Sequence, residues 1–239
     1  MATTPSPRKR ATPPADAGAA PARKGSRTAG ADLSRVLRDR IAKGDLPPGS
    51  KLNEYDLAAE FGIPRTRVRD ALVELEQRGL IERTPNRGAM VAKLGPEQVF
   101  RIYDIREVLE GLCVRLATLN TDPSQWKELY EHFLGPVSQA VHDGNFELYT
   151  DKVSAFRAKC IEAADNPELT RALDNINEKT QVLIRRIVIL PGRAEAGVRQ
   201  QCEILRAMCE GDADRAEAMR RENIRDAKAC LKQYLKYIL

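Results

Sequence analysis

The sequence predicts a mainly α protein, in which a small N-terminal domain of short helices and a β-hairpin precedes an all-α bundle of six helices. Two observations predict this arrangement. Residues 52–79 contain two short helical patterns on either side of a glycine, and two strand-like segments follow them. After Pro96 the chain shows six longer helical patterns, each bounded by capping or helix-breaking residues. We therefore divide the chain into residues 1–30, 31–95 and 96–239.

Residues 1–30 have the composition of a disordered basic tail. Alanine, proline, threonine, serine and glycine are interspersed there with six basic residues and one acidic residue, and no periodic apolar set is present. The net charge of this tail, +5, equals that of the whole chain, so the basic balance of the protein comes from it. Two interpretations stay open, which are loose attraction to phosphate groups and a solvated leader without a binding role.

The second segment begins with a predicted amphipathic helix at residues 33–43, and the turn ProProGly at 47–49 leads from it into a pair of short helices. The first helix of the pair starts at Leu52 and ends at Gly62, because glycine readily takes the left-handed conformation that stops a helix. The second helix starts at Pro64.

This second helix has two chemically different faces. The apolar residues that recur three or four positions apart, and so face inward, are Val68, Ala71, Leu72 and Leu75. The residues that begin its exposed face are Arg65, Thr66, Arg67 and Arg69. Cations at the N-terminal end of a helix oppose the helix dipole, and an external anion would compensate that local cost.

A hairpin follows, with strands at 81–83 and 89–92 joined by the turn ThrProAsnArgGly. Two helices around a glycine, a basic first turn and a hairpin form a winged helix-turn-helix, which presents a helix to the major groove of DNA. Residues 31–95 carry twelve basic and ten acidic residues, so their positive charge must be concentrated, at the basic turn and at Arg83 and Arg87 of the wing. The alternative is a solvated basic face on a small helical domain.

The third segment reads as antiparallel helices on short loops. The predicted helices span residues 96–119, 124–142, 145–165, 168–190, 194–210 and 213–238. Within this bundle three polar residues, Arg157, Gln201 and Asn223, lie at core spacing among apolar neighbours. Burying them without partners would cost several kcal/mol, so something polar should meet them.

Several classes of protein are excluded by what the chain lacks. Five cysteines, odd in number and without a CxxC pair, argue against a disulfide framework. Two histidines cannot build a histidine-rich metal site, and no GxSxG or P-loop motif is present, so we expect no enzyme. No apolar run approaches 18 residues and no hydrophobic leader begins the chain, so we expect a cytoplasmic protein without a membrane partner.

The run from Ile41 to Leu94 resembles the DNA-binding domain of the GntR family of bacterial transcription regulators. The matching motifs are LeuProProGlySer at 46–50, LeuAsnGlu at 52–54, ArgThrArgValArgAspAlaLeu at 65–72 and AsnArgGly at 86–88. Two later motifs resemble the family's helical FadR-type ligand-binding (FCD) domain, and they are ArgGluValLeuGlu at 106–110 and GluGlyAspAlaAspArgAla at 210–216. Six helices suggest the VanR-like branch of that group.

The resemblance implies a dimer that binds a short palindromic operator on double-stranded DNA, in a bacterial cytoplasm and at the nucleoid. Arg65 and Arg69 would reach base edges, where arginine suits the paired acceptors of guanine. Thr66 and Arg67 would meet phosphates. On the wing, where Arg87 adds charge, Gly88 would let the backbone approach the minor groove.

Many relatives hold a divalent metal in the helical domain with one aspartate and three histidines. In this sequence that pattern falls on Val153, Arg157, Gln201 and Asn223, and none is the expected ligand type, so we predict that the metal site is lost. Arg157 would instead place a fixed positive charge there, suited to a small organic acid.

Around Arg157 we expect Gln201, Asn223 and Tyr149 to complete the effector site, with Arg106 as a second anchor. Alternatively Arg157 pairs with an acid such as Glu110 or turns to the surface. Arg106 and Glu110, four residues apart on one helix, could likewise pair with each other.

The resulting expectation is a ligand-responsive transcription regulator with a small anionic effector. The alternative is an architectural or constitutive DNA-binding protein whose helical domain only dimerises. The operator sequence, the identity of the effector and the direction of regulation stay open.

Overall fold

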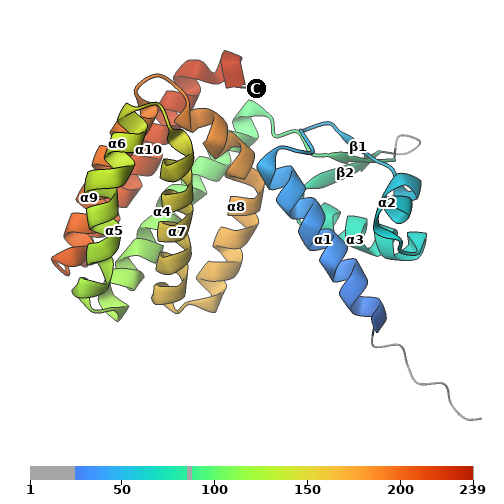
Figure 1. Ribbon diagram of the computed structural model, residues 1–239, viewed down its shortest axis with the longest axis horizontal. Helices are drawn as coiled ribbons and strands as arrows, with labels where there is room; N and C mark the ends of the chain where they lie inside the picture. Colours follow the sequence, from blue (N-terminus) through green and yellow to red (C-terminus); the bar gives the residue numbers. More distant parts are fainter. Residues whose placement is uncertain (1–24, 85–87, 239) are drawn as a thin grey trace, which may run out of the picture.

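The computed structural model describes residues 25–84 and 88–238, and over these residues it confirms a winged helix-turn-helix followed by a helical bundle (Figure 1). We call residues 25–91 the head and residues 96–238 the bundle. The two stand side by side in Figure 1, joined by the short segment 92–95.

The head combines three helices with a small antiparallel sheet. Its elements are α1 (Gly25–Lys43), β1 (Lys51–Leu52), α2 (Glu54–Phe61), α3 (Arg65–Gln77), β2 (Ile81–Thr84) and β3 (Gly88–Val91). The strand order is β1-β3-β2, with Leu52 opposite Ala89 and Ile81 opposite Val91. The core beneath the sheet is formed by α1 and α3, whose residues Leu37 and Leu72 are fully buried.

The start of the helix pair differs from the prediction. Leu52 belongs to β1 and not to a helix, and α2 begins only after Asn53, whose side-chain Oδ1 accepts a hydrogen bond from the backbone N–H of Tyr55 at 2.9 Å. An asparagine cap of this kind defines a helix start. A two-residue strand has no alternating pattern of its own, and only its pairing with β3 shows that it exists.

Helix α1 begins at Gly25, earlier than the predicted residue 33, so the disordered tail predicted for residues 1–30 is wrong for residues 25–30. Apolar periodicity marks only the part of α1 that packs in the head, from Leu33 to Ile41. Residues 25–32 contain two glycines, a serine and a threonine and no large apolar side chain, so neither helix propensity nor apolar periodicity predicts this part of α1. Residues 1–24 lie outside the described part of the chain.

The bundle follows the predicted order of helices closely. Its elements are α4 (Pro96–Asn120), η1 (Pro123–Trp126), α5 (Lys127–His132), η2 (Phe133–Val137), α6 (Ser138–His142), α7 (Phe146–Ala164), α8 (Pro167–Val188), α9 (Arg193–Cys209) and α10 (Ala213–Ile238). Helix α10 packs along α4, and α7 packs on the same helix. α4 is therefore the central helix of the bundle, and it is also the helix that continues from the head.

One predicted helix, residues 124–142, is interrupted. A 3-10 turn opens it, and a π turn at Phe133–Val137 separates α5 from α6. Pro136 lies in this π turn and has no N–H to donate to the preceding turn, so the widened turn accommodates the missing hydrogen bond. Phe133 and Val137 are fully buried, so the side chains of the π turn still pack in the core of the bundle.

Aromatic side chains fill the centre of the bundle. Trp126, the only tryptophan of the chain, is fully buried and packs edge-on against Phe156 with ring centroids 6.4 Å apart. Its Nε1–H donates to Thr121 Oγ1 at 3.0 Å. Phe133 and Tyr149 form a second edge-to-face pair, also at 6.4 Å.

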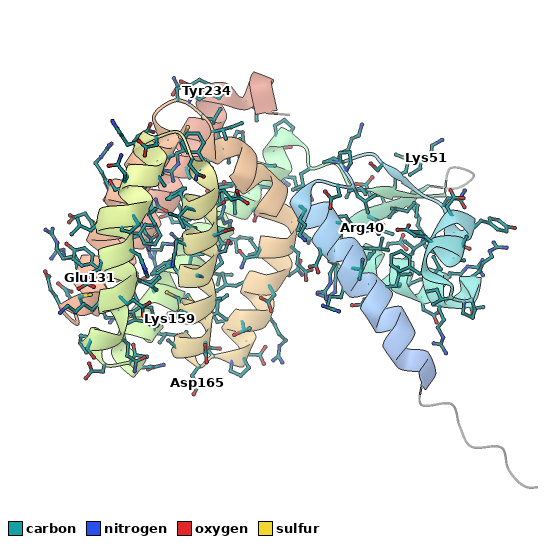
Figure 2. All side chains as sticks on the ribbon, viewed as in Figure 1. Arg40, Lys51, Glu131, Lys159, Asp165 and Tyr234 are labelled. Carbon is teal, nitrogen blue, oxygen red and sulfur yellow. The ribbon has the colours of Figure 1, made fainter. Side chains whose placement is uncertain are left out.

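The head and the bundle bury separate cores. Among the described residues, no apolar cluster has members from both parts. Charged side chains, such as that of Glu131 on α5, extend outward from the helices of both parts (Figure 2). None of the described helices has the length and apolar character that crossing a membrane requires.

Candidate nucleic-acid interface and ligand cavity

The first turn of α3 lies on the surface of the head with its backbone N–H groups free of a side-chain cap. Pro64 at the N-cap makes no capping hydrogen bond, and no acidic residue occurs in this turn. Arg65, Thr66 and Arg69 are exposed, while Val68 on the opposite face is fully buried. The structure therefore places the predicted DNA-contacting residues of α3 together, at the positive end of the helix dipole.

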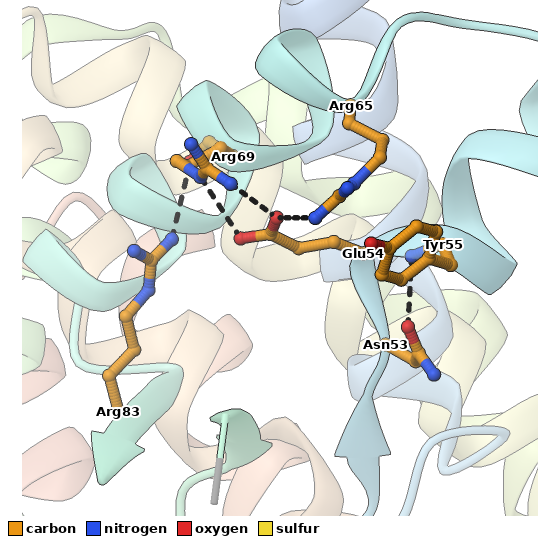
Figure 3. A network of polar contacts seen from close by, with 6 residues as sticks. All are labelled: Asn53, Glu54, Tyr55, Arg65, Arg69 and Arg83. Atoms are coloured by element: carbon orange, nitrogen blue, oxygen red, sulfur yellow. Dashed lines mark hydrogen bonds and ion pairs between the residues drawn. The ribbon is translucent and has the colours of Figure 1, made fainter. Parts of the chain in front are cut away.

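A single carboxylate, that of Glu54, holds both predicted base-reading arginines (Figure 3). Arg69 donates to it twice, from Nε at 3.2 Å and from Nη2 at 2.8 Å, and Arg65 lies 3.4 Å away. The guanidinium of Arg65 also stacks over the ring of Tyr55, 3.6 Å from its centroid. The hydrogen bond from Arg69, opposed by burial and aided by the charges of both arginines, lowers the pKa of Glu54.

Glu54 was missed as a functional residue by the sequence analysis. It precedes Arg65 by 11 residues and Arg69 by 15, on a different helix, so no helical spacing connects them. Only the fold of the helix pair brings the first turn of α2 against the first turn of α3. A carboxylate can also accept a hydrogen bond from cytosine, so Glu54 has the chemistry to contact a base edge itself.

The remaining predicted DNA-contacting residues have different surroundings. Arg67 lies 3.5 Å from Asp70 one turn further along α3. Gly88, at the start of β3, has a φ of +78° and nothing within 4 Å of the place a Cβ would occupy, so close approach of another backbone is possible there. Arg83 donates to the backbone carbonyl of Arg69 at 3.3 Å and so supports α3 from the sheet. Arg87 lies outside the described residues.

A cavity of about 120 Å³ lies within the bundle and collects all five predicted effector-binding residues. They come from four helices, and they are Arg106 on α4, Tyr149 and Arg157 on α7, Gln201 on α9 and Asn223 on α10. Apolar side chains from α8, including Ile187 and Val188, close another side. Three charged residues of this lining were not predicted from the sequence, and they are Asp151, Arg193 and Arg220.

Glu110 is buried behind the cavity and pairs with two of its arginines. Arg106 donates to Glu110 Oε1 at 2.8 Å, as the alternative interpretation of this pair predicted, and Arg220 pairs with Oε2. All three side chains are at most 5% exposed. Burial raises the pKa of Glu110, but the charges of Arg106, Arg220 and Arg157 outweigh it, so the pKa is well below its ordinary range.

The polar lining continues from this ion pair to the cavity rim. Arg220 donates to Asn223 Oδ1 at 3.2 Å, and Asn223 Nδ2 donates to Gln200 at 2.7 Å. Arg193 donates to the same Gln200 oxygen at 3.3 Å. Asn223, predicted to contact a ligand, therefore has its oxygen engaged within the protein and retains a second amide hydrogen.

Arg157 is the cavity arginine without a partner. Among the described side chains, none forms an ion pair or hydrogen bond with it, and its buried Nε has no acceptor. Burial lowers its pKa to about 10; Glu110 opposes this shift, and the nearby charges of Arg106 and Arg220 add to it. The side chain is thus still charged at neutral pH and lines the cavity, instead of pairing with Glu110.

Two further donors face the same space. Gln201 is 2% exposed, and its buried Nε2 has no hydrogen-bond partner among the described residues. Tyr149 is buried beside Gly197, where a Cβ would collide with its hydroxyl. Burial raises the pKa of Tyr149 despite Arg193 and Arg220, so its phenol remains a neutral donor.

A divalent metal does not fit this cavity. The four positions that the resemblance assigns to metal ligands do converge there, but Val153 has no donor atom and Arg157 is a cation. The described part of the chain contains no group of three histidine, cysteine, aspartate or glutamate residues that could hold a metal ion.

Two family models match this chain. The model described as FCD domain matches residues 101–226, more than half of the chain, and the model described as bacterial regulatory proteins, gntR family, matches residues 31–91.

Individual relatives agree with these matches. The chain is 29% identical over 143 residues to the uncharacterized HTH-type transcriptional regulator YdhC of Bacillus subtilis, covering 59% of this chain and 63% of that protein. It is 28% identical over 144 residues to the "Probable D-xylose utilization operon transcriptional repressor" of Paenarthrobacter nicotinovorans, covering 60% and 63%. The chain thus spans less than two thirds of the length of either relative. The solved structure of E. coli McbR/YncC shares the fold, with a TM-score of 0.71 at 23% identity, over 87% of this chain and 98% of that one.

The ion pairs of Glu110 lead to a stability prediction. Glu110→Gln should lower the free energy of unfolding, measured by urea titration, by about 3–5 kcal/mol, because it leaves buried guanidinium groups without a carboxylate. The effect depends on pH. Because the pKa of Glu110 is lower in the folded state than its ordinary value of 4.5, the carboxylate stabilises the fold above that pH. This stabilisation is lost as the pH falls through the folded-state pKa, and the variant should lack it.

Glu107→Gln is the matched control on the same helix. Glu107 pairs with the exposed Arg225 at 2.8 Å, so its loss should cost about 1 kcal/mol or less. Equal losses in the two variants would contradict the role given to Glu110.

Proposed function

Because the chain belongs to the gntR family of bacterial regulatory proteins and carries an FCD domain, we propose that it is a ligand-responsive transcription regulator that binds a short palindromic operator as a dimer. The bacterial nucleoid is then its place of action, and no catalytic role is assigned. The name of the Paenarthrobacter relative supports repression as the output.

The observation that supports regulated binding, and not an architectural role, is that Arg157 lines a polar cavity and pairs with none of the side chains that the structure describes. A bundle that only dimerised would gain nothing from a partly buried arginine whose Nε–H is shielded from solvent without an acceptor, because that donor carries a desolvation cost. A ligand that supplies the missing carboxylate recovers that cost, and so binds the folded protein.

The charges around the cavity define the effector more closely. Four arginines, Arg106, Arg157, Arg193 and Arg220, face two carboxylates, Glu110 and Asp151. A ligand with two negative charges, such as a short dicarboxylate, would balance this excess. Its carboxylates would receive hydrogen bonds from Arg157, Gln201 and Tyr149.

Dimerisation is supported by an exposed apolar stripe on α4. Ile105 and Val108 are 53% and 48% exposed, and with Leu112 and Leu119 they lie along one side of the helix. One winged helix reads only a few base pairs, so a second copy packed on this stripe would supply the second half-site and the twofold symmetry of a palindrome.

The base-reading assignment is tested by arginine variants of α3. Arg65→Ala and Arg69→Ala should each weaken operator binding by about 1–3 kcal/mol and relax the sequence preference. Arg67→Ala, the control, should weaken operator and random duplexes alike and reduce the salt dependence of binding. Fluorescence anisotropy measures the affinity of each variant for an operator selected from random DNA and for an unrelated duplex. If Arg65→Ala and Arg69→Ala both kept the sequence preference of the wild type, the two arginines would not be the residues that contact base edges.

The dimer interface is tested by placing charge on the stripe. The double variant Ile105→Asp, Val108→Asp should be monomeric in sedimentation equilibrium, because an unpaired carboxylate buried in an interface costs several kcal/mol. It should also lose operator affinity. Leu134→Asp is the control, since Leu134 is 60% exposed and belongs to the π turn Phe133–Val137, not to α4. A variant on α4 that remained dimeric would place the interface elsewhere.

The effector site is tested by thermal unfolding with malonate, succinate, inorganic phosphate and butyrate in an uncharged or cationic buffer. A dianion at about 100 times its Kd should raise the midpoint by roughly 5–10 °C, whereas butyrate, with one charge, should act weakly. Arg157→Gln should abolish the rise and leave operator affinity without ligand unchanged. A chelator should leave the midpoint unaltered.

Arg171→Gln provides the matched control for this experiment, because Arg171 is an exposed arginine paired within α8. If Arg157→Gln still responds as the wild type does, the anion binds elsewhere. If butyrate matches succinate, the effector carries one charge.

A further inference from the structure

One carboxylate of the bundle, that of Glu178 on α8, pairs with two arginines of the head. Arg38 on α1 donates to Glu178 Oε1 at 2.6 Å. Arg78, the C-cap residue of α3, donates to both carboxylate oxygens, at 3.0 and 3.2 Å. Glu178 is only 18% exposed in its side chain, so these pairs are partly shielded from solvent. One side chain of the bundle thus holds the first helix of the head and the end of its DNA-reading helix.

Helix α1 of the head also lies against α8 of the bundle. A cavity of about 440 Å³ opens between them beside Glu178, lined by Pro47 and Leu80 of the head and Leu94 of the joining segment. Lys179 lies over Gly79, where an added Cβ would come within 3.2 Å of its Cε. No apolar cluster of the described residues spans the two parts, so the contact of α1 with α8, the ion pairs of Glu178 and the joining segment together set the orientation of the head.

The same helix reaches the ligand cavity. Ile184, Ile187 and Val188 of α8 line that cavity. Ile184 follows Glu178 by six residues, or about 9 Å along a helix. A continuous α8 therefore has its middle in contact with the head and its C-terminal end in contact with the ligand site.

We infer that Glu178 is a positioning residue, a latch that fixes the orientation of the head and that moves with the cavity wall. A ligand that shifts the C-terminal half of α8 moves Glu178 relative to Arg38 and Arg78, and so changes the equilibrium between docked and released heads. Binding energy reaches the DNA-reading helix only if docked and released states bind the ligand differently. The role of the latch in regulation rests on the proposed function. The attachment of the head through Glu178, and its link to the cavity wall, do not depend on that function.

The latch is tested by hydrogen–deuterium exchange on the full chain. Glu178→Gln removes the charge and keeps the shape. Exchange should rise about 3- to 10-fold in residues 38–43 and 78–82, where the head docks. By the reciprocity of coupled sites, exchange should also change at residues 184–188 in the cavity wall.

Three variants serve as controls and cross-checks. Glu168→Gln changes an exposed acid of the same helix whose partner, Arg171, is also on α8, so exchange in the head should stay at the wild-type level. The double variant Arg38→Gln, Arg78→Gln should reproduce Glu178→Gln. The triple variant, with Glu178, Arg38 and Arg78 all replaced by glutamine, should show no faster exchange than the double variant, because the three residues form one network of ion pairs.

Each outcome decides one part of the inference. Unchanged exchange in the head of Glu178→Gln would overturn the latch. Faster exchange in the head with an unaltered cavity wall would overturn the coupling and leave only an attachment point. DNA binding by the same proteins is measured separately, and a wild-type chain that binds no DNA would refute the proposed function without affecting the exchange result.

Discussion

Glu110 lies between the guanidinium groups of Arg106 and Arg220, where α4 meets α10, and all three side chains are almost completely buried. Ions in such a place are tolerated only as a paired and hydrogen-bonded set, because each carries a desolvation cost of several kcal/mol. Glu110 satisfies two arginines, and both of its oxygens are then engaged. The third arginine, Arg157, has no partner among the described side chains, and the effector chemistry proposed for the cavity rests on that shortage of negative charge.

Among the described residues, five carboxylates each pair with two arginines. Two of them, Glu203 and Glu217, join neighbouring helices of the bundle, and the other three lie at the sites described above. Glu54 holds Arg65 and Arg69, Glu110 holds Arg106 and Arg220, and Glu178 holds Arg38 and Arg78. In each case one carboxylate joins two arginines, and at least one of them belongs to another element. The three sites differ in burial, from the exposed first turn of α3 to the closed centre of the bundle. Their ion pairs therefore differ in strength, and those at the surface are the easier ones to exchange for an external anion.

The order of helices and five residues of the cavity lining were predictable, because both depend on local signals. Glycine, proline and aspartate mark the helix ends, and Arg157, Gln201 and Asn223 stand out as polar residues within apolar stripes. The partners of those residues were harder to predict. Glu54 and Glu178 each bind arginines on other elements, and no periodic pattern connects them. Arg220 is an intermediate case, since it lies three residues before Asn223 on the same helix and helical spacing alone could have identified it.

The separate cores and the single tryptophan together have a spectroscopic consequence. Trp126 is fully buried in the bundle, and the head contains no tryptophan. Indole emission therefore reports the bundle alone, whereas far-ultraviolet circular dichroism reports the helices of both parts. In a denaturant titration, coincident curves would mean that the two parts unfold as one cooperative unit, and separated curves would give the stability of the head by difference. The chain thus carries its own probe of how strongly its two parts depend on each other.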